Sequence, residues 1–170
     1  CLKFWKKNWS NGIDVETLIN IWGSSEEKIL KEKLSEVREF LSNKEIKKAL
    51  DCVMSIGHFA NEYFSEQAPW AQFKDNPQLA SETIAKTASM IFIVACALRP
   101  FLPHLSKEMT SLYGDVEEEV IAQIYQGDFR ALKSIYEKNQ TPVKTPKALI
   151  PKIEDEVINK LNEQLKSLNN

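Results

Sequence analysis

A helical segment that ends at a proline constrains the fold of this 170-residue chain more than any other feature. Proline disfavours the α conformation of the residue before it, so Pro69 should end the helix at or before Ala68. We therefore expect a helix that reaches Gln67 at most, with Trp70 directly beyond the break on a rigid proline turn. Upstream of the break, apolar residues recur every three or four positions, which places them on one helix face: Ile46, Ala49, Leu50, Val53, Gly57, Ala60 and Phe64.

Two pairs of residues before this stripe have the spacing of capping boxes. Ser24 with Glu27 predicts the start of a helix over about residues 25–42, and Ser42 with Glu45 predicts the start of the next one. The expected apolar face of the first of these helices consists of Leu30, Leu34, Val37, Phe40 and Leu41.

Asn76-Pro77 predicts a further helix, because asparagine is a good N-cap and proline suits the first helical position. The segment that follows is apolar around much of its surface, so this helix should be central. Its longest apolar run, residues 90–98, is far shorter than the roughly 20 residues needed to cross a bilayer, so we expect no membrane contact. Further helices are expected over residues 1–9, 103–113 and 129–138, and in a segment that ends at residue 125.

The two ends of the chain differ in character. Residues 1–9 look like the end of a helix that begins upstream. Three prolines between 139 and 151 predict an extended connection, and a last helix should start near Glu154. We expect an all-α bundle: residues 1–138 form the bundle, with its first helix truncated at the N-terminus, and residues 139–170 form a return connection and a C-terminal helix packed on the bundle. The apolar stripe of that helix is Val157, Ile158, Leu161, Leu165 and Leu168.

Composition argues against several classes of function. Cys1, Cys52 and Cys96 include no closely spaced pair, so neither a zinc site nor a disulfide framework is expected. His58 and His104 have no partner at ligand spacing, and the chain has no glycine-rich phosphate loop or nucleophile–base pair. We therefore expect no catalytic and no metal-binding residue. A net charge of -2 argues against a nonspecific nucleic-acid binder, and nothing resembles a signal peptide.

Three segments resemble the anticodon-binding domain of methionyl-tRNA synthetases, in the order found in that family. They are residues 61–70 (Asn-Glu-Tyr-Phe-Ser-Glu-Gln-Ala-Pro-Trp), 98–106 (Leu-Arg-Pro-Phe-Leu-Pro-His-Leu-Ser) and 149–154 (Leu-Ile-Pro-Lys-Ile-Glu). The resemblance covers most of residues 44–154. It implies a helical bundle of the class I synthetase type, with a C-terminal helix that folds back, and recognition of the CAU anticodon.

The resemblance implies an anticodon-binding role for Trp70, with Asn61, Tyr63 and Pro69 as the other candidates. Unpaired bases in RNA loops are read by stacking on aromatic rings, and a ring fixed on a proline corner loses little entropy when a base binds. In the family, the tryptophan of the Pro-Trp pair stacks on an anticodon base. The alternatives are a buried core tryptophan and an Asn61 that ties down the loop presenting Trp70. An asparagine and an arginine that read bases in the family fall upstream of Cys1.

The parent enzyme that the resemblance implies attaches methionine to its tRNA with ATP and magnesium, and often carries a zinc knuckle, all in a catalytic half that this chain lacks. The chain itself should then hold no cofactor and be inactive alone. It should act in the cytoplasm as a monomer. Its expected partners are the anticodon loop of methionine tRNA and the catalytic domain of the same polypeptide. Two alternatives stay open. One is the equivalent domain of the isoleucine, valine, leucine or cysteine enzyme, and the other is a helical protein–protein adaptor without an RNA role.

Overall fold

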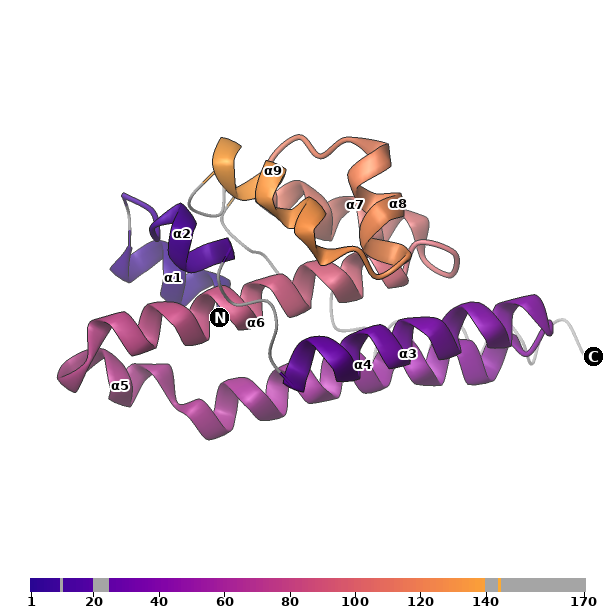
Figure 1. Ribbon diagram of the computed structural model, residues 1–170, viewed down its shortest axis with the longest axis horizontal. Coiled ribbons are helices and arrows are strands. Elements are labelled where there is room, and N and C mark those ends of the chain that lie inside the picture. Colours follow the sequence, from indigo (N-terminus) through magenta and orange to yellow (C-terminus); the bar gives the residue numbers. More distant parts are fainter. Residues whose placement is uncertain (10, 20–24, 140–143, 145–170) are drawn as a thin grey trace, which may run out of the picture.

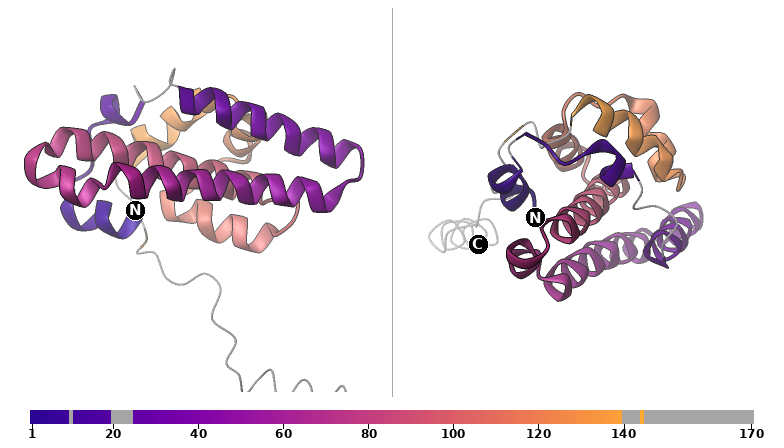
Figure 2. Two further views of the ribbon diagram at one scale, coloured as in Figure 1. Left: turned by 90° about the horizontal axis from the view of Figure 1, so that it is seen from below. Right: turned by 60° about the vertical axis from the view of Figure 1, so that its left-hand side comes forward.

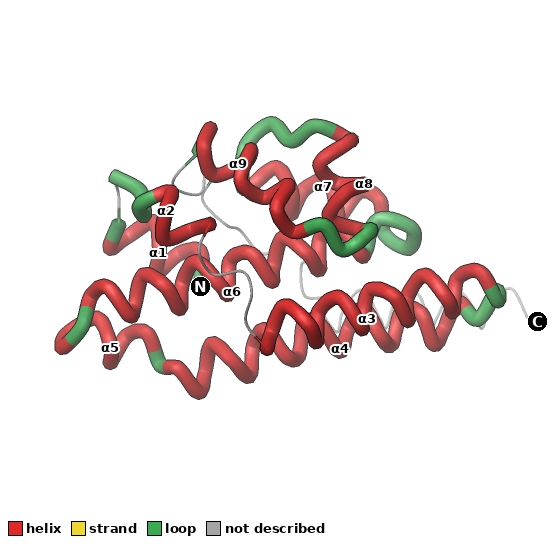
Figure 3. Tube along the Cα trace, viewed as in Figure 1, coloured by secondary structure: helices red, strands yellow, loops and turns green. Residues whose placement is uncertain are grey.

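The computed structural model describes residues 1–9, 11–19, 25–139 and 144, and all regular elements in these ranges are helical (Figures 1 and 3). This confirms the expected all-α class. The α-helices are α1 (Leu2–Asn8), α2 (Val15–Ile19), α3 (Ser25–Ser42), α4 (Ile46–Gln67), α5 (Pro69–Asp75), α6 (Pro77–Ala97), α7 (Pro103–Thr110), α8 (Glu118–Tyr125) and α9 (Leu132–Lys138). Short 3-10 turns follow α7 (Ser111–Tyr113) and precede α9 (Phe129–Ala131).

Helix α6 lies at the centre of the molecule, as its sequence predicts. The α3–α4 hairpin packs on one side of α6, and α7, α8 and α9 lie on the other (Figures 1 and 2). By length and composition α6 could cross a membrane, but 72% of its apolar segment is buried inside the protein, which identifies it as a core helix. Its side chains Ile84, Phe92 and Ile93 are fully buried.

Two of the predicted helix boundaries are set by proline, as expected. Helix α4 ends at Gln67, and Ala68 adopts a left-handed conformation with φ 44°. At the start of α6, the side chain of Asn76 accepts a hydrogen bond of 3.1 Å from the backbone N–H of Leu79. Asparagine and proline therefore act here as the N-cap and first helical residue that their order predicts.

The capping box predicted for Ser42 and Glu45 is wrong. Ser42 is the last residue of α3, and its hydroxyl donates to the carbonyl of Arg38 at 2.9 Å. Glu45 occupies the N-cap position of α4 without a side-chain capping bond. The turn between the helices is closed instead by the backbone, with Lys44 at φ 62°. The other predicted cap, Ser24, lies outside the described residues.

Two short helices, α2 and α5, are absent from the sequence-based expectations. We expected a turn at Pro69, whereas Pro69 is the first residue of α5 and Trp70 lies in the first turn of this helix. Proline removes only an N–H that would be unpaired at that position, so it can end one helix and begin the next. At the corner between α6 and α7, Leu102 directly precedes Pro103 and is 45% exposed.

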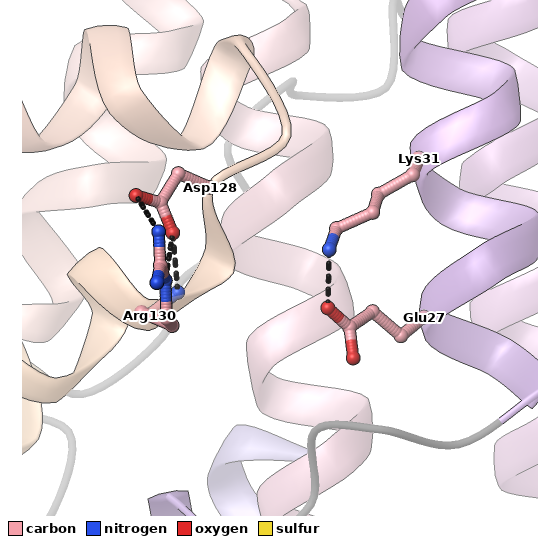
Figure 4. A network of polar contacts seen from close by, with 4 residues as sticks. All are labelled: Glu27, Lys31, Asp128 and Arg130. Carbon is pink, nitrogen blue, oxygen red and sulfur yellow. Dashed lines mark hydrogen bonds and ion pairs between the residues drawn. The ribbon is translucent and has the colours of Figure 1, made fainter.

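Helix α3 faces the turn before α9, and each side carries an ion pair of its own (Figure 4). Lys31 forms an ion pair of 2.6 Å with Glu27, and its ammonium lies 5.8 Å from the centre of the Phe129 ring. On the facing loop, Arg130 pairs with Asp128 at 2.8 Å. Of these contacts, the one between Lys31 and Phe129 connects the α3–α4 hairpin to the helices on the far side of α6.

The predicted C-terminal helix from Glu154 lies outside the described residues. Within them, the chain after α9 has two contacts to the region that follows α7. The Asn139 side-chain amide donates to the carbonyl of Tyr113 at 3.1 Å, and the Lys144 ammonium donates to the hydroxyl of Ser111 at 3.1 Å.

Replacing Gly57 by alanine should raise the free energy of unfolding by about 1 kcal/mol, since glycine is disfavoured inside a helix and nothing lies within 4 Å of the added Cβ. Thermal denaturation should show a rise of roughly 2–4 °C. Gly127→Ala is the control, because its φ of 90° strains any L side chain, so this variant should be less stable. A Gly57→Ala protein that melts below the unsubstituted chain would contradict the described packing of α4.

Candidate nucleic-acid interface

The corner between α4 and α5 holds Trp70 in a fixed but accessible position. Pro69 is buried, whereas the Trp70 side chain is 49% exposed. The Trp70 ring packs edge-on against Phe64 of α4, with ring centres 5.6 Å apart and planes at 68°. Gln72, one turn away from Ala68, accepts a hydrogen bond of 2.9 Å from the hydroxyl of Thr83 on α6. The first turn of α5 is thus fixed by both α4 and α6.

The face of α5 that carries Trp70 continues towards α1. Residues three and four apart share a helix face, so Phe73 and Lys74 lie on the same side of α5 as Trp70. The Phe73 ring lies 5.0 Å from that of Trp9 and 6.1 Å from that of Phe4, measured between ring centres. Aromatic rings therefore join α5 to α4 at one end and to α1 at the other.

Asn61 lies on the same side of α4 as Phe64, one turn earlier. Its side chain is exposed, and its amide has no hydrogen-bond partner among the described residues. The geometry thus gives no support to the alternative that Asn61 ties down the loop. Asn61 and Phe64 line a groove of about 230 Å³ together with Cys1 and with Met109 of α7. The amide is therefore free to contact a ligand beside the Trp70 corner.

Tyr63 lies on a different side of α4 from Asn61, because neighbours two positions apart are on nearly opposite sides of a helix. Its ring lies under the ammonium of Lys86, 5.8 Å from the ring centre, and it is half-buried between α4 and α6. Burial raises the pKa of Tyr63 to about 12, with a smaller contribution from the carboxylate of Glu26. The structure thus places Pro69 and Trp70 together at the corner and Asn61 on the side of α4 that carries Phe64, whereas Tyr63 lies on another side.

Phe64, Phe73 and the α1 aromatics belong to this surface but were not identified from the sequence. A helical interpretation of residues 69–75 would have placed Phe73 beside Trp70 by spacing alone. The contact with Phe4 and Trp9 joins residues more than 60 positions apart, and no local pattern indicates it. In the part of the chain that the structure describes, no group of three or more His, Cys, Asp or Glu side chains could hold a metal ion.

In the folded protein the Tyr63 phenol should ionise near pH 12, whereas an exposed tyrosine ionises near pH 10. The Tyr63→Phe variant lacks this phenol, so comparing the two proteins isolates its ionisation. Between these values the folded protein holds the Tyr63 proton more tightly than the unfolded chain does, so the free energy of unfolding falls as pH rises through that window. Below pH 10 this group adds no pH dependence. The absorbance difference between the two proteins at about 295 nm, read within milliseconds of a pH jump, should appear near pH 12. A difference that appears near pH 10 would mean that the ring is solvated.

Comparison with known proteins agrees with the family resemblance. Residues 20–170 match the family model described as the anticodon binding domain of methionyl tRNA ligase. The methionine–tRNA ligase of Streptomyces avermitilis is 29% identical over 145 residues, which are 84% of this chain and 25% of that protein. That of Borrelia duttonii is 27% identical over 161 residues, 94% of this chain and 20% of that protein. The chain thus spans a quarter or less of the length of these relatives, and it belongs to the family of anticodon-binding domains of methionyl-tRNA ligase.

Proposed function

We propose that this chain recognises the CAU anticodon of methionine tRNA as the anticodon-binding part of a methionine–tRNA ligase. The observation that carries the proposal is Trp70, a large ring that is 49% exposed on a corner fixed by two helices. An exposed tryptophan on a mobile loop would lose entropy when a base stacks on it. This ring has already lost most of that entropy on folding, so more of the stacking free energy is available for binding.

The neighbouring residues suit three different roles in this recognition. Pro69 is buried at the first position of α5, so it would fix the corner without touching RNA. Asn61 presents an unpaired amide on the same side as Phe64, where it can donate to and accept from a base edge. Tyr63 packs between helices on another face, so its role would be to hold α4 in place.

In this proposal, attachment of methionine belongs to the other part of a longer enzyme. That part would bind ATP with magnesium, and zinc where a zinc knuckle is present, while the present chain supplies recognition and acts in the cytoplasm as part of a monomer. The family match favours the methionine enzyme over those for isoleucine, valine, leucine or cysteine. A helical adaptor without an RNA role is the alternative from a different class.

Trp70→Ala should weaken binding of a CAU anticodon stem–loop by about 1–3 kcal/mol, the range measured for one stacking contact. Because the ring is half-exposed, most of the folding stability should remain. Fluorescence anisotropy with labelled RNA measures the affinity, and thermal denaturation measures the stability.

Leu102→Ala is the matched control for Trp70→Ala. Leu102 lies at the corner between α6 and α7 and is 45% exposed. Removing the Leu102 side chain should leave the affinity for RNA unchanged. Trp70→Phe should keep part of the affinity because a ring remains. If Trp70→Ala lowers stability and leaves RNA binding intact, the ring is a core residue and the adaptor alternative gains support.

We further propose that residues 139–170 return along the bundle and pack a C-terminal helix on it. Two observations support this: the family model extends to residue 170, and Asn139 and Lys144 are hydrogen-bonded to the segment after α7. The stripe from Val157 to Leu168 is too apolar to stay solvated.

A chain truncated after Lys152 should therefore melt at a lower temperature than the full chain or aggregate. Each apolar side chain removed from an interface exposes surface worth about 1.5–3 kcal/mol before ordering costs. Calorimetry and sedimentation measure the two effects. A truncated protein that remains monomeric and melts at the same temperature would place this segment against another part of the enzyme.

A further inference from the structure

Helices α1 and α5, which meet beside Trp70, carry three lysines that form no ion pair with the residues that the structure describes. Lys3 and Lys7 are exposed and lie one turn apart on α1, and Lys74 is exposed one turn after Trp70 on α5. Within the described ranges, no carboxylate forms an ion pair with any of the three. On other surfaces some lysines form such pairs, as Lys31 does with Glu27 and Lys138 with Glu117, whereas the exposed Lys47 and Lys107 form none with the described residues.

The aromatic contacts fix these lysines relative to Trp70. Helix α1 lies at the same end of α6 as α5 (Figure 1), and the Phe4 and Trp9 rings pack on Phe73. Lys7 follows Phe4 by three residues, so it lies on the side of α1 that borders α5. On α5, Lys74 shares a face with Trp70 and Phe73. Lys7 and Lys74 therefore lie on the sides of α1 and α5 that flank the Phe73 contact, and Lys3 lies one turn before Lys7 on α1.

The acidic residues nearby lie on other faces. Glu62 and Glu66 of α4 are exposed, but helix geometry places each of them about 100° or more around α4 from Phe64, the residue that touches Trp70. Asp75 is one position past Lys74, about 100° around α5. The Trp70 side of this corner is therefore locally positive on a chain whose net charge is -2.

We propose that Lys3, Lys7 and Lys74 form a phosphate-binding rim that holds the RNA backbone on either side of the base stacked on Trp70. The inference rests on the proposed function and adds to it a second ligand chemistry at the same surface. An ammonium group is a compact point charge that attracts phosphate without reading the base. The rim accordingly supplies affinity and orientation, and leaves discrimination among anticodons to groups that touch base edges.

The test compares two variants that each remove two positive charges. Lys7→Gln/Lys74→Gln removes the part of the rim nearest Trp70, whereas Lys28→Gln/Lys47→Gln removes exposed lysines of α3 and α4. Anisotropy titrations of a CAU stem–loop and of a stem–loop with a scrambled anticodon are run at several salt concentrations. Far-ultraviolet circular dichroism confirms that each variant is folded.

The rim variant should lower the slope of log affinity against log salt by about 1.4, since each phosphate contact to a single strand contributes about 0.7. Its affinities for the two loops should fall by the same factor, so the ratio between them is preserved. The α3–α4 control should keep the slope of the unsubstituted chain. Trp70→Ala should lose affinity with an unchanged slope, because stacking releases no counterions.

The possible results separate the two proposals. If the rim variant and its control have equal slopes while Trp70→Ala still weakens binding, the phosphate rim is excluded and anticodon recognition stands. If the unsubstituted chain binds neither loop even at the lowest salt concentration, anticodon recognition by this chain fails and the rim fails with it.

Discussion

Burial of α6 on nearly all sides is the constraint on which the rest of the structure depends. A helix that is apolar all round is stable in water only when other helices cover it, and here they do so from both sides. Its polar side chains are compatible with this position because they have partners. Ser89 and the Tyr136 hydroxyl are 2.5 Å apart, and the Tyr113 hydroxyl donates to the carbonyl of Ala88 at 2.6 Å. Helices α4, α5 and α1 all take their positions from contacts with this core.

The packing of α4 and α5 on α6 makes the Trp70 corner rigid. Ala68 has a positive φ, which costs an L residue about 1–2 kcal/mol, so the corner persists only because packing on both sides offsets the cost. Pro69 is buried, and the bond from Thr83 to Gln72 holds α5 to α6. The strain therefore lies directly beside the one large aromatic side chain on α5 that is half-exposed. This coincidence is typical of a site where the protein fixes a group before its ligand arrives.

Much of the fold could be predicted from the sequence, and the failures have definite causes. Helical periodicity and the signals at Pro69 and Asn76-Pro77 are local, and the structure confirms them. Ser42 failed as a cap because a serine near a helix end can donate backwards to a carbonyl as well as accept from an N–H, and spacing does not distinguish the two. Helix α5 was missed because a proline that ends one helix was not considered as the first residue of another.

The candidate site could be predicted only in part, because some of its residues are brought together by contacts between segments far apart in the sequence. Trp70 was identified from its motif, and the separation of Tyr63 from Asn61 follows from helix periodicity, although it was not inferred. The packing of Phe4 and Trp9 on Phe73 is a long-range contact, and it decides where the α1 lysines lie. The sequence alone does not single out these lysines, because charge runs are usually solvated helix faces.

The net charge of -2 and an RNA-binding role are compatible once charge is considered locally. Nonspecific affinity rises with the number of phosphates a protein neutralises, so a uniformly basic domain would bind every RNA in the cell. With the proposed rim of Lys3, Lys7 and Lys74 beside Trp70, the domain would gain this attraction where a loop can also place a base on the ring. Stacking then requires an unpaired base, which a double helix does not offer. The acidic residues on the rest of the surface would repel phosphates and so weaken competing RNA contacts there. The same charge balance therefore argues against a general nucleic-acid binder and favours a protein that selects a single loop.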